Sequence, residues 1–215
     1  MIVSSLRITE IFYSLQGESN TVGIPTVFIR LTGCPLRCVY CDTAYAFSGG
    51  KKIEIEEIIV EVEQYATRYI TVTGGEPLAQ PACLELIKQL LDKGFIVSLE
   101  TSGAIDVSGV DSRAVKVMDL KTPGSGELDK NIYQNIDYLS SKDQVKFVIG
   151  NNEDYDWSKA TLTKYGLLER CEVLFSPVMG LQNPSELADK ILQDRLPVRF
   201  QIQLHKLLWD NAQGK

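Results

Sequence analysis

The sequence predicts an α/β protein built as an open, partial β/α barrel, and three observations support this prediction. Short β-branched segments alternate with segments of helical periodicity along the whole chain, a pattern typical of a mostly parallel sheet. The chain has 215 residues, fewer than the ~250 residues of a complete eightfold barrel. Some segments between predicted strands are too short for a full helix. We therefore expect a single domain, residues 1–215, whose chemistry gathers at the carboxyl ends of the strands.

The first half of the chain contains three strand-like segments and two helical ones. The strands are rich in β-branched residues, and the first helix has apolar residues at positions 55, 58, 59 and 62, which is helical spacing. Gly94 follows the second helix, where a glycine commonly ends a helix. In chain order we expect a strand over 6–12, a strand over 26–31, a helix over 55–65, a strand over 69–73, and a helix over 81–93 with Pro81 in its first turn.

The second half continues the alternation by the same criteria. β-Branched and aromatic segments bounded by turn residues predict its strands, and apolar residues at helical spacing predict its helices. In chain order we expect strands over 95–99, 115–120 and 145–149, a helix over 154–165, a strand over 172–175, a helix over 184–193 and a strand over 198–203.

Composition excludes several classes of function. The net charge is −6, without a basic block, which argues against direct nucleic-acid binding, because such binding depends on Lys and Arg neutralising phosphates. No apolar run approaches the 18 or more residues that cross a bilayer. The N-terminus, residues 1–7, lacks an apolar stretch with a cleavage site. We therefore expect a cytoplasmic protein that acts on a small molecule.

Three of the five cysteines lie close together directly after the strand over 26–31. Cys34, Cys38 and Cys41 have the spacing C-x3-C-x2-C, and an odd number of cysteines in a reducing compartment argues against a disulfide framework. Three thiolates on one loop can each bind one iron of a cubane cluster. Because no fourth cysteine lies nearby, the fourth iron would remain open to a substrate or cofactor.

A structural zinc site is the alternative explanation of these cysteines. Such sites use four ligands, commonly in two C-x2-C or His pairs, and this chain has one C-x2-C pair and one histidine, His205. Cys83 lies in a helical pattern and Cys171 at the start of a strand, where small buried residues are common. We expect the iron–sulfur cluster and assign no role to Cys83, Cys171 or His205.

The cysteine spacing after an early strand resembles the signature of the radical S-adenosylmethionine (SAM) superfamily. The resemblance implies a radical SAM type of partial barrel, in which the open iron binds SAM and a 5′-deoxyadenosyl radical abstracts hydrogen from the substrate. The next strand ends in Thr73-Gly74-Gly75-Glu76-Pro77. Glycine and proline there are also compatible with an ordinary turn, but beside the cysteine loop the stretch resembles the superfamily's GGEP motif for SAM.

Further stretches narrow the resemblance to the 7-carboxy-7-deazaguanine synthases. They are residues 13–19, residues 28–31, Cys41-Asp42-Thr43 and residues 99–103. The resemblance spans essentially the whole chain. It implies conversion of 6-carboxy-5,6,7,8-tetrahydropterin to 7-carboxy-7-deazaguanine with loss of ammonia, in queuosine biosynthesis. It also implies Mg²⁺, a flavodoxin or ferredoxin as reductant, and a homodimer.

The same resemblance suggests the site residues. Arg30 is expected to bind the substrate carboxylate, for which its fork is well shaped, although a salt bridge is the plain alternative. Thr43 is expected to bind Mg²⁺, and Tyr40 to lie near the adenine unless it is ordinary core packing. The remaining expected substrate contacts are Leu15, Gln16, Gly17 and Thr101. The remaining expected SAM contacts are Cys41, Asp42, Gly74, Gly75, Glu76, Gly103, Ser141, Lys142, Asp143, Ser176, Pro177, Val178 and Met179, of which the two late groups are equally compatible with strand-flanking turns.

Two other functions remain open from the sequence. A glycyl-radical activase shares the cysteine spacing on the same scaffold, but its substrate would be a partner protein. A zinc-stabilised binding module without catalysis would need a fourth well-spaced ligand.

Overall fold

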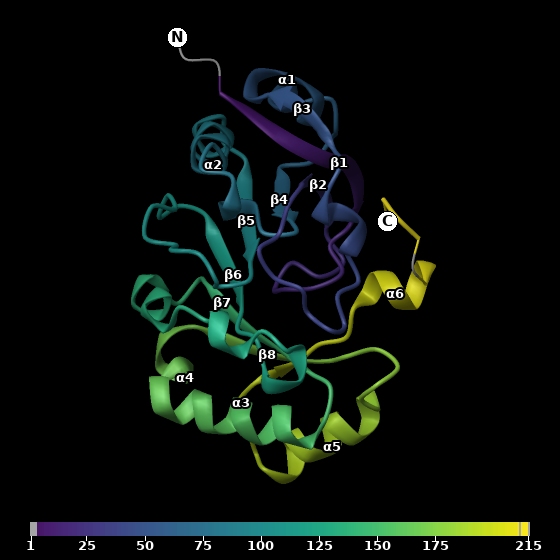
Figure 1. The fold of residues 1–215 in the computed structure, drawn as a ribbon, viewed down its shortest axis with the longest axis vertical. Helices are drawn as coiled ribbons and strands as arrows, with labels where there is room; N and C mark the ends of the chain where they lie inside the picture. Colours follow the sequence, from purple (N-terminus) through teal and green to yellow (C-terminus); the bar gives the residue numbers. More distant parts are fainter. Residues whose placement is uncertain (1–3, 211, 215) are drawn as a thin grey trace.

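The computed structural model describes residues 4–210 and 212–214, and their strands form one sheet. The order is β3-β1-β2-β4-β5-β6-β7-β8-β9. From β2 to β9, neighbouring strands run parallel, whereas β1 pairs antiparallel with both β2 and β3. The edge strands β3 and β9 are not paired with each other, so the sheet is an incomplete barrel (Figure 1), which confirms the predicted fold class.

The strands are β1 (Ser5–Leu15), β2 (Pro25–Leu31), β3 (Lys51–Glu54), β4 (Tyr69–Gly74), β5 (Ile96–Thr101), β6 (Val115–Asp119), β7 (Gln144–Ile149), β8 (Glu172–Pro177) and β9 (Arg199–Phe200). The α-helices are α1 (Ile55–Val62), α2 (Cys83–Asp92), α3 (Asn152–Tyr165), α4 (Leu167–Arg170), α5 (Pro184–Gln193) and α6 (Leu204–Trp209).

Two apolar clusters fill the space between the sheet and its helices. In the first, Ile55, Ile58, Ile59 and Val62 of α1 are buried with side chains of the early strands. In the second, Phe147 of β7 is buried with side chains of the late strands and helices. Burying such a side chain contributes about 1.5–3 kcal/mol, so these helices are fixed by their apolar faces.

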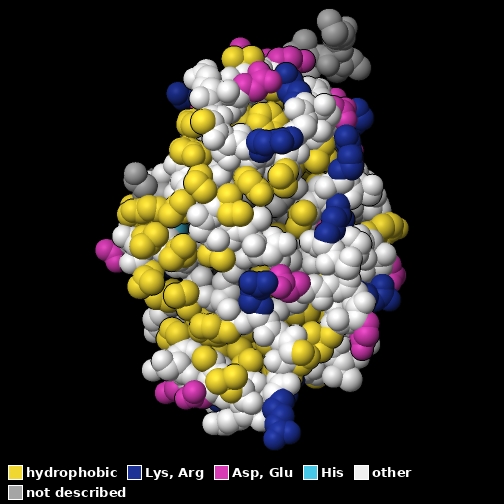
Figure 2. Space-filling model, turned by 180° about the vertical axis from the view of Figure 1, so that it is seen from behind, with side chains coloured by type: hydrophobic (Ala, Val, Ile, Leu, Met, Phe, Trp, Pro, Cys, Tyr) yellow, Lys and Arg dark blue, Asp and Glu magenta, His cyan; other side chains and the backbone are white. Residues whose placement is uncertain are grey.

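Helix α6 is placed differently from the others. In Figure 1 it lies apart from α2, α3 and α5, and its first residue, Leu204, donates its N–H to Gly17 O in the loop after β1. From the opposite side, Figure 2 shows a surface on which hydrophobic side chains are interspersed with charges of both signs. Among the described residues, no helix is both long and apolar enough to span a membrane.

Several element boundaries differ from those predicted, for local reasons. Helix α2 begins at Cys83, so Pro81 precedes it, whereas Gly94 has φ +86° just past its end. Helix α3 begins at Asn152 because the Asn151 side chain accepts a hydrogen bond from the Asp154 N–H, a standard N-cap. Strand β9 keeps only two residues, and α4, α6 and the edge strand β3 were not predicted.

Candidate functional site

The cysteine loop follows β2 and is held by backbone hydrogen bonds at both ends. Gly33, with φ +100°, donates its N–H to Ala46 O at 2.8 Å. Cys41 donates its N–H to Cys38 O at 3.2 Å. The three thiols are free and partly exposed, and all three line one cavity. Partial burial raises the pKa of the Cys34 and Cys38 thiols, so a metal bound there would have to displace protons.

The turn after β4 packs directly against this loop. Glu76 donates its N–H to Gly33 O at 2.8 Å, and Gly75 donates its own to Leu31 O at 3.2 Å. A Cβ atom on Gly75 would lie 2.3 Å from Gly33 O and 2.6 Å from Cys34 Cβ. Only glycine therefore allows this approach.

The cavity has a volume of about 610 Å³ and is bounded by the ends of several strands. This size is within the range of small-molecule sites. The predicted site residues that border it are Leu15, Gln16, Gly17, Arg30, Cys34, Cys38, Tyr40, Cys41, Asp42, Thr43, Gly74, Gly75, Thr101, Val178 and Met179.

Arg30 lines the cavity and is also engaged in an ion pair. Its Nε atom donates to Glu10 Oε1 at 2.7 Å, and the side chain is 16% exposed. The guanidinium also lies over the rings of Phe12 and Tyr45. The salt bridge that the sequence left open is therefore present at Nε. A substrate carboxylate, the other predicted partner of Arg30, would have to bind to the Nη atoms.

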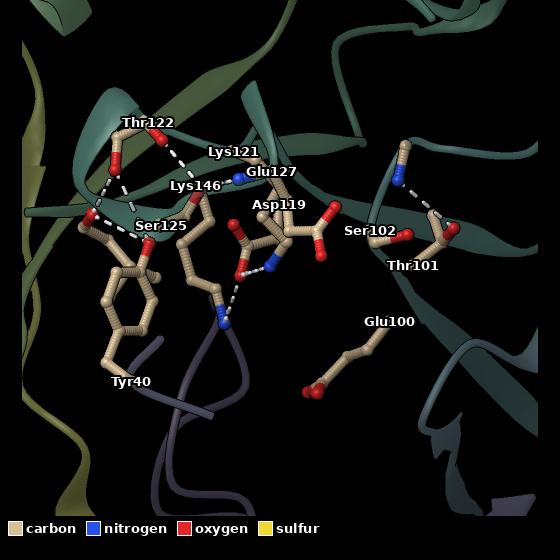
Figure 3. Close-up of polar contacts among 12 residues, drawn as sticks. Tyr40, Glu100, Thr101, Ser102, Asp119, Lys121, Thr122, Ser125, Glu127 and Lys146 are labelled. Carbon is tan, nitrogen blue, oxygen red and sulfur yellow. Dashed lines mark hydrogen bonds and ion pairs between the residues drawn. The ribbon is translucent and has the colours of Figure 1, made fainter. Parts of the chain in front are cut away.

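The inner wall of the cavity carries a chain of buried charges. Lys146 lies 2.5 Å from Glu18 Oε2 and 3.8 Å from Asp119 Oδ2, and Lys121 lies 3.1 Å from the same Asp119 oxygen. Figure 3 shows Lys146, Asp119 and Lys121 together, with Glu100 opposite. Asp119 Oδ1 is buried without a hydrogen-bond partner among the described residues. An unpaired carboxylate oxygen at a cavity is costly unless a ligand completes it.

Neighbouring charges set the pKa values in this wall. Burial acts to lower the pKa of Lys146, but the charges of Glu18, Asp119 and Glu100 outweigh it and raise the pKa well above its usual range. Burial also acts to raise the pKa of Glu18, but Lys146 lowers it overall. Glu100 is different, because burial dominates and raises its pKa. The wall therefore presents the Lys146 ammonium between the carboxylates of Glu18 and Asp119. A further carboxylate, Glu100, protonates more readily.

Tyr40 lies beside these charged residues at the cavity. Its hydroxyl donates to Val148 O and lies near Thr122 Oγ1, both at 3.4 Å (Figure 3). Burial and the nearby Asp119 charge raise the pKa of Tyr40 to about 12. The ring therefore remains neutral and offers an apolar face beside the cysteine loop.

The C-terminal segment closes the cavity near Gly17 and Asp42. Leu204 donates its N–H to Gly17 O at 3.0 Å, and Gln203 Nε2 donates to Glu18 Oε1 at 2.7 Å. Lys206 lies 2.7 Å from Asp42 Oδ2. Burial acts to raise the pKa of Asp42, but the Lys206 ammonium outweighs it and holds the pKa well below its usual range.

Seven predicted SAM contacts do not border the cavity: Glu76, Gly103, Ser141, Lys142, Asp143, Ser176 and Pro177. Glu76 is fully buried. Its carboxylate accepts hydrogen bonds from the Leu78 N–H at 3.0 Å, the Thr101 hydroxyl, and both the N–H and the hydroxyl of Ser102 at 2.6 Å. The side chain therefore ties the β4 turn to the end of β5.

The prediction for Ser141, Lys142 and Asp143 is corrected by their position. They precede β7, and in a parallel sheet the residues before a strand lie at the edge opposite to those after it. Asp143 is fully buried, accepts the Lys116 N–H at 2.7 Å and pairs with its ammonium at 3.2 Å. These residues fix the amino ends of β6 and β7.

Sequence reasoning missed several residues of the cavity. Lys146 was detectable, because a lysine inside an apolar strand is the same signal that singled out Arg30. Asp119 and Lys121 were detectable as polar residues at the carboxyl end of β6. No motif or periodicity in the sequence indicated that the C-terminal segment, with Gln203, His205 and Lys206, would line the cavity. The missed residues are Glu18, Glu100, Asp119, Lys121, Lys146, Gln203, His205 and Lys206.

The thiols suit a cluster better than a single metal ion. Within residues 4–210 and 212–214, no three His, Cys, Asp or Glu side chains converge closely enough to bind one ion. A tetrahedral zinc site requires such convergence, whereas the thiolates of a cubane cluster bind separate irons. The zinc-stabilised module therefore has no site in the described part of the chain.

Comparison with known proteins shows which family the chain resembles along nearly its whole length. The family model of the radical SAM superfamily matches residues 28–190. The 7-carboxy-7-deazaguanine synthase of Chlorobaculum tepidum is 41% identical over 213 residues, covering 97% of each chain. The enzyme of the same name from Koribacter versatilis is 39% identical over 219 residues, covering 95% of this chain and 97% of its own. The crystal structure of QueE from Escherichia coli matches with a TM-score of 0.78 at 22% identity, over 94% of this chain and 95% of that one, and so shares the fold.

Proposed function

The chain belongs to the radical SAM superfamily and, within it, to the family of 7-carboxy-7-deazaguanine synthases, and we propose that it converts 6-carboxy-5,6,7,8-tetrahydropterin to 7-carboxy-7-deazaguanine with loss of ammonia, a step of queuosine biosynthesis. The observation that carries the proposal is one cavity that is lined both by three thiols and by Arg30, Gln16 and Gly17. Residues 1–215 would form one catalytic domain.

Membership of the superfamily brings a 4Fe-4S cluster and SAM as cofactors. In this proposal Cys34, Cys38 and Cys41 hold the cluster, and the donor set fits it, since three free thiols face one cavity. When bound, the cluster and SAM supply hydrogen-atom abstraction, and the protein supplies orientation. Gly74 and Gly75 provide a flat backbone beside Cys34, and Tyr40 provides an apolar wall with a neutral hydroxyl.

Other side chains would hold the substrate. Arg30 offers its Nη atoms to the substrate carboxylate. The side chain of Gln16 is nearly fully buried, and its amide donates to Thr71 Oγ1 at 3.0 Å, which fixes the orientation of the loop before Gly17. Thr101 and Leu15 also line the cavity and complete the proposed substrate contacts. The substrate's polar ring would then face the charged wall of Glu18 and Lys146.

A magnesium ion is proposed at Thr43 beside Asp42. The Thr43 hydroxyl donates to Asp42 Oδ1 at 2.8 Å, and hydroxyl and carboxylate oxygens are donors that Mg²⁺ prefers. A flavodoxin or ferredoxin as reductant and assembly as a homodimer complete the proposal, and both rest on the resemblance to the family.

The test is anaerobic turnover of the cluster-loaded enzyme with the tetrahydropterin, SAM, Mg²⁺ and dithionite, followed by mass spectrometry. We expect 7-carboxy-7-deazaguanine to appear. Formation of 5′-deoxyadenosine without this product would show that the assigned substrate is wrong. Formation of neither by a fully loaded enzyme would overturn the proposed activity. Cys38→Ala is the matched negative control and should lose both iron and product while remaining soluble.

A further inference from the structure

The loop that follows β6 holds the backbone on both sides of Cys38. Ser125 O accepts the Val39 N–H at 3.0 Å, and Glu127 Oε1 accepts the Arg37 N–H at 2.5 Å. Figure 3 shows Ser125 and Thr122 beside Tyr40, two residues beyond Cys38. Two backbone donors flanking one cysteine are therefore both bound by oxygens from a segment about 90 residues away in the sequence.

This loop is itself rigidly supported. The Ser125 hydroxyl donates to Thr122 O at 2.6 Å and accepts the Glu127 N–H at 3.1 Å. The Asp154 carboxylate, fully buried in the first turn of α3, accepts the Gly124 N–H at 2.6 Å. Because each loop residue is fixed by a neighbour, Glu127 presents its carboxylate to Arg37 in a defined position.

The Arg37 side chain supports the same stretch from its other side. Its Nη1 atom donates to Cys34 O at 2.8 Å and to Leu36 O at 2.6 Å, and the guanidinium lies 4.2 Å from the centre of the Phe47 ring. The backbone of Arg37 is thus fixed by Glu127, and its side chain is fixed on the cysteine loop. Cys38 follows Arg37 directly, so its position depends on both the backbone and the side-chain contacts of Arg37.

Hydrogen bonds to the sulfurs, nearby charge and solvent access set the reduction potential of an iron–sulfur cluster. An N–H that bonds to a ligand sulfur stabilises the reduced cluster and raises the potential. The Arg37 and Val39 N–H groups adjoin Cys38 but are bound to loop oxygens, so they are withheld from its sulfur. Withholding these N–H groups lowers the reduction potential. A carboxylate nearby also lowers it, because its negative charge opposes the added electron.

We propose that Glu127 is a positioning residue for the Cys38 ligand, holding the Arg37 N–H away from the cluster and keeping the cluster's reduction potential low. The inference rests on the proposed function, since it needs a cluster on Cys34, Cys38 and Cys41. It concerns a residue that does not line the cavity.

The test uses the cluster-loaded enzyme and three variants, prepared anaerobically. Glu127→Ala removes both the charge and the acceptor, and Glu127→Gln keeps an acceptor without the charge. Asp129→Asn is the matched control, because Asp129 lies two residues away, is 75% exposed and pairs with Lys130. The readouts are iron per chain, the electron paramagnetic resonance spectrum of the reduced cluster, and the fraction of cluster reduced at a fixed potential.

We expect Glu127→Ala to lose iron, to change the spectrum, and to raise the ratio of reduced to oxidised cluster by more than about threefold, because one removed charge in a partly solvated site accounts for about threefold and the released Arg37 N–H adds to it. Glu127→Gln should recover the iron content and the native spectrum, with a smaller rise in the reduced fraction. Asp129→Asn should match the native enzyme in all three readouts.

The inference is overturned if Glu127→Ala matches the native enzyme in all readouts. It is also overturned if Asp129→Asn changes them as much as Glu127→Ala, because the effect would then be one of general charge. A native chain that holds no cluster at all would overturn the proposed function and this inference with it, so the two failures are distinguishable.

Discussion

The Lys146 ammonium lies 2.5 Å from the Glu18 carboxylate at the inner wall of the cavity, and both side chains are nearly buried, at 12% and 10% exposed. The two residues are 128 positions apart, so their contact fixes the loop after β1 against β7. A buried pair of this kind is costly to break, because the remaining charge is left without compensation.

Lys146→Met should therefore lower the free energy of unfolding by about 3 kcal/mol at pH 7, or by roughly 6–12 °C in Tm for a chain of this size. The measurement is thermal unfolding of the chain without its cluster, followed by circular dichroism. Lys93→Met is the control, since Lys93 and its partner Glu63 are 46% and 43% exposed, and such pairs contribute under about 1 kcal/mol.

The same pair predicts a pH dependence. The pKa of Glu18 is lowered in the folded chain, so its stabilisation is present above the ordinary carboxyl pKa of 4.5 and is lost as the pH falls through the lowered value. In Lys146→Met, the buried Glu18 keeps the hydrogen bond from Gln203 but has lost its cationic partner, so it protonates more readily. The difference in Tm between the two proteins should thus narrow between pH 7 and pH 4, and a constant difference would exclude the pair as its cause.

Gly75→Ala should displace the cysteine loop. The new Cβ would lie 2.3 Å from Gly33 O, a backbone atom that cannot move without moving Cys34. Overpacking of this kind costs about 1–3 kcal/mol. We expect less than about half of the native iron per chain after anaerobic reconstitution. Gly109→Ala is the control, because its Cβ would meet only the Leu84 Cδ1 methyl group at 3.1 Å, and native iron content in Gly75→Ala would contradict the prediction.

The sequence was informative wherever chemistry lies next to a strand end. Cys34, Gly75 and Arg30 could be placed together because parallel strands bring their carboxyl ends to one edge. The same rule applied to Lys121 would have found the loop after β6, whereas Lys142 was chosen from the wrong end of β7. The contact of Lys206 with Asp42 could not be predicted from strand ends. It depends on how the C-terminal segment folds back over the cavity, and no sequence pattern indicates that course.

Arg30→Lys should raise the KM for the tetrahydropterin by about tenfold, because an ammonium cannot meet a carboxylate with two parallel hydrogen bonds. The absorption spectrum of the cluster should not change, since Arg30 lies on β2 before the cysteine loop. Steady-state kinetics at saturating SAM measure this. Arg7→Lys is the control, because Arg7 contacts Gly49 O and Gly50 O and does not line the cavity. An unchanged KM in Arg30→Lys would leave Arg30 only its ion pair with Glu10.

Glu76→Gln distinguishes a structural role from a contact with SAM. In the structure the carboxylate accepts hydrogen bonds from the Ser102 N–H and hydroxyl and from the Leu78 N–H. An amide can accept through one oxygen only, so its NH₂ group would face a donor and leave it unsatisfied, which costs about 1–3 kcal/mol. We therefore expect the Tm of the chain without cluster or SAM to fall. If Glu76 instead acted on SAM directly, that Tm would remain native and only the affinity for SAM would weaken. Glu85→Gln, on the exposed face of α2 with its carboxylate bonded to Gln89, should change neither quantity.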